Sequence, residues 1–351
     1  MSYLLGPQTF GYSNAVVKAM KSFLLPQTTL RELIVVDTVN EIIEILENTN
    51  YKESFVKLST LYSGVDLVEH ALSENLAKTC KRIVKVTPQE AKPLILSLLK
   101  RFDIYNLKTI LIGKSIGASE EEINRLIVNA GSLRKNDIKR LIGLESVDEI
   151  IASMQRTEYG MALKGVVEEY RRTKDLGLIL NSMDMHYYSS LALAADLAHE
   201  AVLKKFIIHE VNSKNIMNVL RARANNLSSD IVAKLIIEGG SFDRAYLLSL
   251  ARLESVKEIV EKLGIKELND AYVKFEQDKS LVHFEIAFEK QLVKESTHEM
   301  RIATLSTSAI VGYLFLKELE IANIRRIIRA KEYDMPKEKI MEIVYNVSEK
   351  V

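Results

Sequence analysis

The chain has 351 residues, of which 47% are hydrophobic and 27% charged, and its formal net charge at pH 7 is +1. This composition is typical of a globular protein, and the near-neutral charge excludes a general electrostatic attraction to nucleic acid or to acidic membranes. The single cysteine, Cys80, excludes an intramolecular disulfide and any CxxC metal site, so we expect a reducing cytoplasm.

The chain is rich in helix-forming residues. No proline occurs between Pro93 and Pro336, and few segments alternate with the period of two that half-buried strands show. We therefore expect an all-α protein. We also expect no secretory signal and no transmembrane segment, because the longest uncharged stretch near the C-terminus, residues 302–316, is too short to span a bilayer.

The first predicted helix start recurs twice further along the chain. Residues 36–43 (VDTVNEII), 144–151 (LESVDEII) and 253–260 (LESVKEIV) share one pattern at nearly equal spacing. Each copy contains S/T-x-x-E, in which the hydroxyl accepts a hydrogen bond from the third helical N–H and the glutamate accepts one from the N–H of the cap residue. The pattern predicts helix caps at Thr38, Ser146 and Ser255.

The next repeated segment begins with an asparagine and reads N-[LI]-x-x-[IV]-[LI]-x-[AG]-[KR]. It occupies residues 106–114, 215–223 and 323–331, with the same spacing as the helix starts. Apolar residues four and eight positions before each asparagine, and four after it, form a helical stripe that the amide interrupts. A buried amide without partners costs about 1–3 kcal/mol. We therefore predict structural roles for Asn106, Asn215 and Asn323, with a ring of ligand-contacting amides as the alternative.

The first copy ends in GKS, which also ends the phosphate-binding pattern G-x-x-x-x-G-K-[ST]. That pattern requires a glycine at position 108, where this chain has Lys108. In the other two copies Ala222 and Ala330 stand at the position of Gly113. We therefore interpret GKS as part of the repeat, and a helical enzyme or nucleotide-binding protein built around it is a rival hypothesis.

The order of the repeated segments indicates a circular permutation. Further helix starts at Ser119, Ser228 and Pro336 follow the three asparagine segments in register. Only residues 332–351 follow the third asparagine segment, and the missing second half of that unit stands around Thr38. We therefore expect three units around a pseudo-threefold axis in one compact body. The expected segments are residues 1–25 (N-terminal segment), 26–87 (second part of repeat three), 88–196 (repeat one), 197–305 (repeat two) and 306–351 (first part of repeat three).

Basic residues follow each asparagine, less uniformly than the apolar ones: Lys108 and Lys114 in the first copy, Arg221 and Arg223 in the second, and Arg325, Arg326, Arg329 and Lys331 in the third. Solvated helix ends are one explanation, because cations there interact favourably with the helix dipole. The alternative is a basic rim that contacts an acidic or carbonyl-rich partner. The interface candidates are Arg221, Arg223, Arg325, Arg329 and Lys331.

Sequence patterns for catalysis and metal binding are missing. His199-Glu200 and His209-Glu210 begin like HExxH, but Leu203 and Ser213 stand where the second histidine would be. No GxSxG, GxGxxG or EF-hand pattern occurs. We therefore expect no catalytic, cofactor-binding or metal-binding residues, no small-molecule substrate and no nucleic-acid partner.

The segment 11–25, GYSNAVVKAMKSFLL, resembles the N-terminal motif Y-x-N-A-R-V-R-A-M-K-S-x-L-L of the C subunit of the archaeal (A-type) rotary ATPases, the counterpart of the d subunit in V-type ATPases. Asn14, Met20 and Lys21 match that motif, whereas Val16 and Lys18 occupy places where the family usually has arginine. The repeat period, the permutation and the chain length agree with the resemblance over essentially the full length.

The resemblance implies a funnel-shaped, all-helical and non-catalytic subunit of the central stalk. Such a subunit sits peripherally on the cytoplasmic face of the membrane, links the proteolipid rotor ring to the central shaft, and transmits torque for coupled ATP synthesis or hydrolysis and ion transport. It adds Asn14 to the interface candidates. The alternative is a closed helical repeat scaffold that binds soluble protein partners.

Overall fold

The computed structural model describes residues 10–302 and 306–344, except for the side chains of residues 296, 297 and 299–302. This part of the chain forms twenty α-helices and contains no strand, so the expectation of an all-α protein is confirmed. Contacts divide the chain into two compact units, one made of Met1–Ile150 with Val293–Val351 and the other of Ile151–Leu292.

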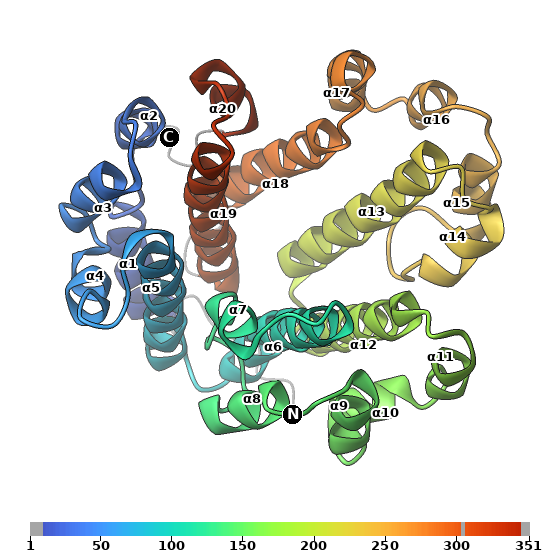
Figure 1. Cartoon of the computed structure of the whole chain (residues 1–351), viewed down its shortest axis with the longest axis horizontal. Coiled ribbons are helices and arrows are strands. Elements are labelled where there is room, and N and C mark those ends of the chain that lie inside the picture. The colour runs from blue at the N-terminus through green and yellow to red at the C-terminus, as the bar shows by residue number, and fades with distance from the viewer. Residues whose placement is uncertain (1–9, 303–305, 345–351) are drawn as a thin grey trace. The chain divides into compact units, whose positions relative to one another are not determined.

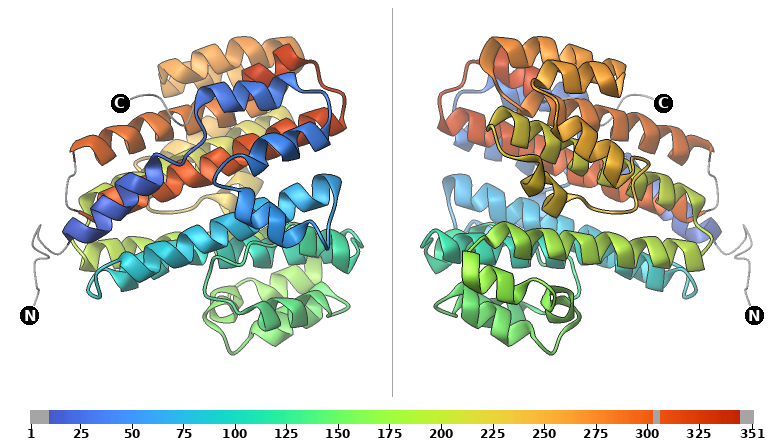
Figure 2. Two further views of the ribbon diagram at one scale, coloured as in Figure 1. Left: turned by 90° about the vertical axis from the view of Figure 1, so that its left-hand side faces the viewer. Right: turned by 90° about the vertical axis from the view of Figure 1, so that its right-hand side faces the viewer.

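The first unit combines helices from both ends of the chain. Its helices are α1 (Gly11–Lys21), α2 (Gln27–Val35), α3 (Val39–Glu47), α4 (Lys52–Leu58), α5 (Gly64–Val86), α6 (Lys92–Ser115), α7 (Glu120–Arg125), α8 (Lys135–Ile142), α19 (Thr307–Glu332) and α20 (Lys337–Ile343). Helix α19 packs against α1, α2, α5 and α20. Figure 1 shows α20 next to the end of α19, and the left view of Figure 2 shows α1 running along α19. Because these neighbours surround α19, most of its residues are buried.

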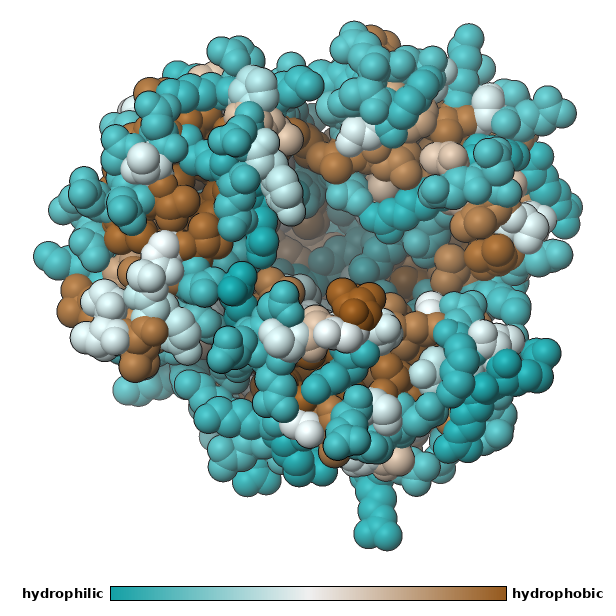
Figure 3. All heavy atoms as spheres, in the orientation of Figure 1, coloured by the Kyte–Doolittle hydropathy of each residue, from teal (hydrophilic) through white to brown (hydrophobic). Residues whose placement is uncertain are grey.

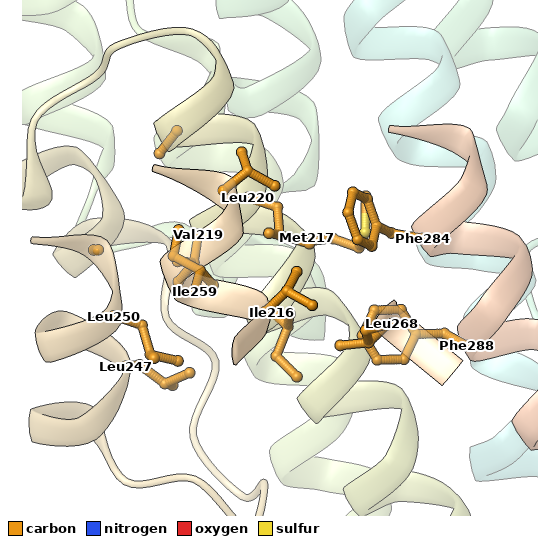
Figure 4. Packing of buried hydrophobic residues seen from close by; sticks show 14 of the residues in the cluster. Ile216, Met217, Val219, Leu220, Leu247, Leu250, Ile259, Leu268, Phe284 and Phe288 are labelled. Atoms are coloured by element: carbon orange, nitrogen blue, oxygen red, sulfur yellow. The ribbon is translucent and has the colours of Figure 1, made fainter. Parts of the chain in front are cut away.

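The second unit has its core around one long helix. It contains α10 (Glu158–Leu163), α11 (Val167–Thr173), α12 (Leu176–Leu197), α13 (Ala201–Ala224), α14 (Ser229–Leu235), α15 (Arg244–Ala251), α16 (Val256–Leu263) and α17 (Lys266–Asp278); α9 (Val147–Met154) and α18 (Val282–Ile302) each contain a boundary between the units. Apolar residues of α13, including Ile216 and Leu220, pack against α15, α16, α17 and the first turns of α18 (Figure 4). Burial of these aliphatic and aromatic side chains is the main stabilising contribution to this unit.

Helix bounds recur with the spacing of the sequence repeat. The long helices α6, α13 and α19 end at Ser115, Ala224 and Glu332. Each ends in a Schellman motif, in which a residue with positive φ follows the helix and the next N–H reaches back five residues. The positive-φ residues are Gly117, Asn226 and Asp334, and the bonds run from Ala118 to Gly113 (2.9 Å), from Leu227 to Ala222 (2.8 Å) and from Met335 to Ala330 (2.8 Å).

The end of α6 also argues against GKS as a phosphate-binding loop, because Gly113–Ser115 is the last turn of this helix rather than a loop. Backbone N–H groups in that turn donate within the helix and cannot surround a phosphate. A Cβ on Gly113 would overlap the Ile123 side chain of α7, which explains why glycine replaces the alanine of the other copies.

No helix among the described residues is long and apolar enough to cross a membrane. In the uncharged stretch 302–316, residues 303–305 lie outside the described part, and residues 307–316 form the buried first turns of α19. Apolar side chains are also exposed outside this stretch, for example Val56 on α4 and Leu61 just after it. On the face drawn in Figure 3, brown side chains gather in several places among teal ones.

Candidate functional site

Two of the three repeated asparagines hold a loop to a long helix by the same pair of hydrogen bonds. Asn106 Nδ2 donates to the carbonyl of Val128 (2.8 Å), and its Oδ1 accepts from the N–H of the same residue (2.9 Å). Asn215 makes both contacts with Ile237, at 2.7 and 2.8 Å. Both asparagines are at most 1% exposed, so the amide satisfies backbone groups that water cannot reach.

Asn323 is fully buried in α19, and Arg326 Nη1 lies 3.4 Å from its Oδ1. Val128 and Ile237 each lie 22 residues after their asparagine. The corresponding position after Asn323 is residue 345, which lies outside the described part. The structural role of Asn323 therefore stays a prediction.

A second polar side chain, one turn before Asn106 and before Asn215, holds the end of the same loop. The Asp103 carboxylate accepts from the N–H groups of Ser132 (2.8 Å) and Leu133 (2.9 Å) and from the Ser132 hydroxyl (2.6 Å). Asn212 Oδ1 accepts from the Ser241 N–H (2.9 Å), and its Nδ2 donates to the Ser241 hydroxyl (2.8 Å). The loops that lead into α8 and α15 are therefore each held at two points, by the asparagine and by the polar residue one turn before it.

Glycines make these loop contacts sterically possible. A Cβ on Gly131 would overlap the Asp103 carboxylate, and one on Gly240 would overlap the Asn212 amide oxygen. The sequence analysis missed this pair of sites, because the acceptor alternates between aspartate and asparagine. The signal was available in the Gly-Ser dipeptides at 131–132 and 240–241, which recur with the spacing of the asparagine segments.

The predicted caps at Thr38, Ser146 and Ser255 lie directly before α3, α9 and α16. The hydroxyls of Thr38, Ser146 and Ser255 each accept from the backbone N–H three residues later, at 3.2 Å in all three cases. The Glu41 carboxylate accepts a hydrogen bond from the Thr38 N–H (2.8 Å), which completes a capping box. These contacts satisfy N–H groups that have no partner inside the helix.

Two of the basic candidates hold the segments that lead into these caps. Arg223 Nη1 donates to the carbonyl of Leu253 (3.2 Å), two residues before Ser255. Lys331 Nζ donates to the carbonyls of Ile34 (2.9 Å) and Val36, and the latter lies two residues before Thr38. Burial and the nearby Lys337 ammonium lower the pKa of Lys331 from its usual value.

The remaining arginine candidates form ion pairs inside their own units. Arg325 Nε donates to the buried Glu69 carboxylate (2.8 Å), and Arg329 lies within 3.5 Å of Glu69 and 3.4 Å of Glu332. Arg221 pairs with Glu285 at 2.5 Å. The side chains of Arg221 and Arg329 remain 51% and 42% exposed, so these two are the most accessible of the set.

Asn14 lies inside the first unit rather than on its surface. It is 3% exposed, and its Nδ2 donates to the carbonyls of Phe10 (3.1 Å) and Ser306 (3.2 Å). It thereby joins the start of α1 to the residue that caps α19. An interface contact from Asn14, as from the basic residues, stays a prediction.

One cavity of about 280 Å³ opens between α5 and the α7–α8 segment of the first unit. His70 and Tyr62 lie on its wall with ring centroids 4.0 Å apart, and Lys135 and Lys139 also line it. Burial lowers the pKa of His70 below its usual value. Among the described side chains no group of three histidine, cysteine or acidic residues is placed to hold a metal ion.

Comparison with known proteins identifies the relationship of this chain. The family model described as ATP synthase (C/AC39) subunit matches residues 13–343. The chain belongs to this family. Among its relatives, the C subunit of the A-type ATP synthase of Methanococcoides burtonii is 34% identical over 338 residues, covering 94% of this chain and 92% of the relative. The corresponding C subunits of Haloferax volcanii and Methanosarcina acetivorans are 32% and 31% identical, over 92% and 94% of this chain and 93% and 91% of the relatives.

The family match extends from the N-terminal motif through α20, so it includes all three asparagine segments and both units. The resemblance of segment 11–25 to the N-terminal motif of this family therefore led to the correct family. The relatives named here are C subunits of A-type ATP synthases.

Proposed function

We propose that this chain is a non-catalytic central-stalk rotor subunit of an A/V-type ATPase. In this role it binds the membrane proteolipid ring and the central shaft on the cytoplasmic face, as a peripheral subunit. It transmits torque for coupled ATP synthesis or hydrolysis and ion transport. The observation that carries the proposal is the match of a single ATP synthase subunit family over residues 13–343, with relatives of nearly equal length.

The recurrent contacts support the mechanical part of the proposal. In α6 and α13, two polar side chains one turn apart fix a loop to the long helix, and the caps and Schellman motifs recur with the same spacing. We propose that the three sequence repeats stand around a pseudo-threefold axis and form a funnel. A body whose loops are bonded to its long helices resists shear better than one with loose connections, because those hydrogen bonds must break before a loop slides along its helix, and a close-packed interior transmits strain.

The direct test is co-migration of the purified chain with the detergent-solubilised proteolipid ring of the same organism, with and without shaft subunits. Size-exclusion chromatography at moderate and high salt separates bound from free chain. We expect co-elution with the ring, or with ring and shaft together. Failure to co-elute with either would leave a helical scaffold for soluble proteins as the function.

A charge-swapped variant tests the exposed arginine at position 221. The double substitution Arg221→Glu with Glu285→Arg keeps the ion pair inside the unit but reverses the charge presented at each position. If Arg221 contacts a partner, the variant should elute mainly free at moderate salt, while its melting temperature stays near that of the wild type. Unchanged co-elution would assign Arg221 to the internal pair alone.

A further inference from the structure

Helix α19 carries a charged group that is entirely buried. Lys317 and Glu320 are at most 1% exposed, and Lys317 Nζ donates to Glu320 Oε1 (2.7 Å) and to the Tyr51 hydroxyl (2.9 Å). The Tyr51 hydroxyl donates to the same carboxylate oxygen (2.7 Å), and Glu320 Oε2 accepts from the backbone N–H of Leu25. Burial, followed by the nearby Glu320 carboxylate, raises the pKa of the Tyr51 phenol well above its usual range, so the phenol remains a donor.

The position of Glu320 in the repeat explains the contact. Glu320 stands three residues before Asn323, as Asp103 and Asn212 stand three residues before their asparagines. Leu25 likewise stands as far before the Thr38 cap as Leu133 stands before the Ser146 cap. Asp103 accepts from the Leu133 N–H, and Glu320 accepts from the Leu25 N–H. Glu320 therefore makes, with a residue from the other end of the chain, the contact that Asp103 makes with a nearby loop.

The third copy differs from the other two in three ways that fit this long-range role. Phe23 stands at the position of Gly131 and Gly240, so the backbone has a side chain where the others have none. The acceptor is a glutamate, which is one methylene longer than aspartate or asparagine. Its charge is compensated by Lys317 and the Tyr51 hydroxyl, both of which are fully buried.

Other contacts tie the two ends of the chain together near the C-terminal end of α19 and the start of α20. Lys331 donates to carbonyls of Ile34 and Val36, and Lys337 donates to that of Val35 (2.5 Å). These lysines are partly exposed, whereas Glu320 is not. A buried carboxylate that loses its donors is far more costly than an exposed pair, because it has no water to replace them.

We propose that Glu320, with Lys317, is a latch that ties the chain just before α2, at Leu25, and just before α4, at Tyr51, to α19. It does so across a connection that is a short loop in the other two copies. In the other copies a continuous segment joins the acceptor to the bound residue, whereas here the latch joins two distant segments. Breaking it should therefore loosen residues 25–58, while α3 and α4 still pack on α5. The proposal rests on the contacts of the first unit and is independent of the rotor function.

Hydrogen exchange of the full chain, followed by mass spectrometry, tests the latch. In Glu320→Ala, amides of residues 25–58 should exchange at least tenfold faster than in the wild type, while those of residues 151–292 remain unchanged. The matched control is Asp103→Ala, which removes the corresponding contact inside a continuous segment. Its effect should be confined to residues 131–142.

Milder variants keep the test valid if Glu320→Ala does not fold. Glu320→Gln retains an acceptor for the Leu25 N–H, and Tyr51→Phe removes only one hydroxyl, so each should raise exchange in residues 25–58 by a smaller factor. Faster exchange restricted to those residues supports the latch. No increase there in any variant, or an equal increase over both units, would overturn it.

Discussion

Asn215 should contribute strongly to stability, because its amide binds both the N–H and the carbonyl of Ile237. Replacing it by leucine keeps the branching at Cγ but leaves the Ile237 N–H and carbonyl without these partners in a buried site. Each unpaired group costs about 1–3 kcal/mol, and partial rearrangement lowers the sum, so we expect a loss of about 2–4 kcal/mol. At roughly 3 °C per kcal/mol for a unit of this size, the melting temperature should fall by about 6–12 °C.

The assay is thermal unfolding followed by circular dichroism, with amide exchange at Ile237 as the local readout. Asn269→Leu serves as the control, because Asn269 is exposed on α17 in the same unit. The Ile237 amide should lose its protection only in the Asn215 variant. Equal melting temperatures for the two variants, with Ile237 still protected, would refute the role assigned to the buried amide.

Three further predictions follow from the first unit. Gly131→Ala should destabilise it by about 1–3 kcal/mol in urea unfolding, since a Cβ would overlap the Asp103 carboxylate, whereas Gly143→Ala, with no atom closer than 3.5 Å, should change little. Cys80 is buried and its pKa is raised by that burial, so iodoacetamide at pH 8 should modify it in denaturant but not in the native chain. The pKa of His70 is lowered by burial, so the unfolded chain binds a proton more readily, and stability should fall as pH drops below about 6.5. His70→Gln should remove that part of the pH dependence in unfolding curves, and an unchanged dependence would contradict it.

The sequence predicted the elements that depend on local patterns. Helix starts after Thr38, Ser146 and Ser255 follow from a four-residue signature, and the long helices follow from apolar periodicity around the asparagines. The partners of the asparagines did not follow, because a backbone N–H and carbonyl in a separate loop carry no residue-specific signal.

The partners of the interface candidates could not be predicted from the sequence either. Arginines and lysines after each asparagine have the same composition whether they face solvent, a partner or a carbonyl of their own unit. The structure directs Arg223 and Lys331 to carbonyls before α16 and α3. The sequence did not predict the Glu320 site, because the three equivalent acceptors are aspartate, asparagine and glutamate, and only their positions in the repeat agree.

The central claim, that this chain turns with the rotor, is tested most directly by cross-linking within the assembled complex. Single cysteines are introduced at exposed positions at the ends of long helices, such as Ile116 and Tyr333, and those that cross-link to the proteolipid ring are selected. We predict that cross-linked complexes retain ATP-driven ion transport, because ring and subunit move together. A cross-link between the ring and the stationary membrane subunit serves as the control that stops transport. Loss of transport on linking this chain to the ring, to the level of that control, would contradict the account.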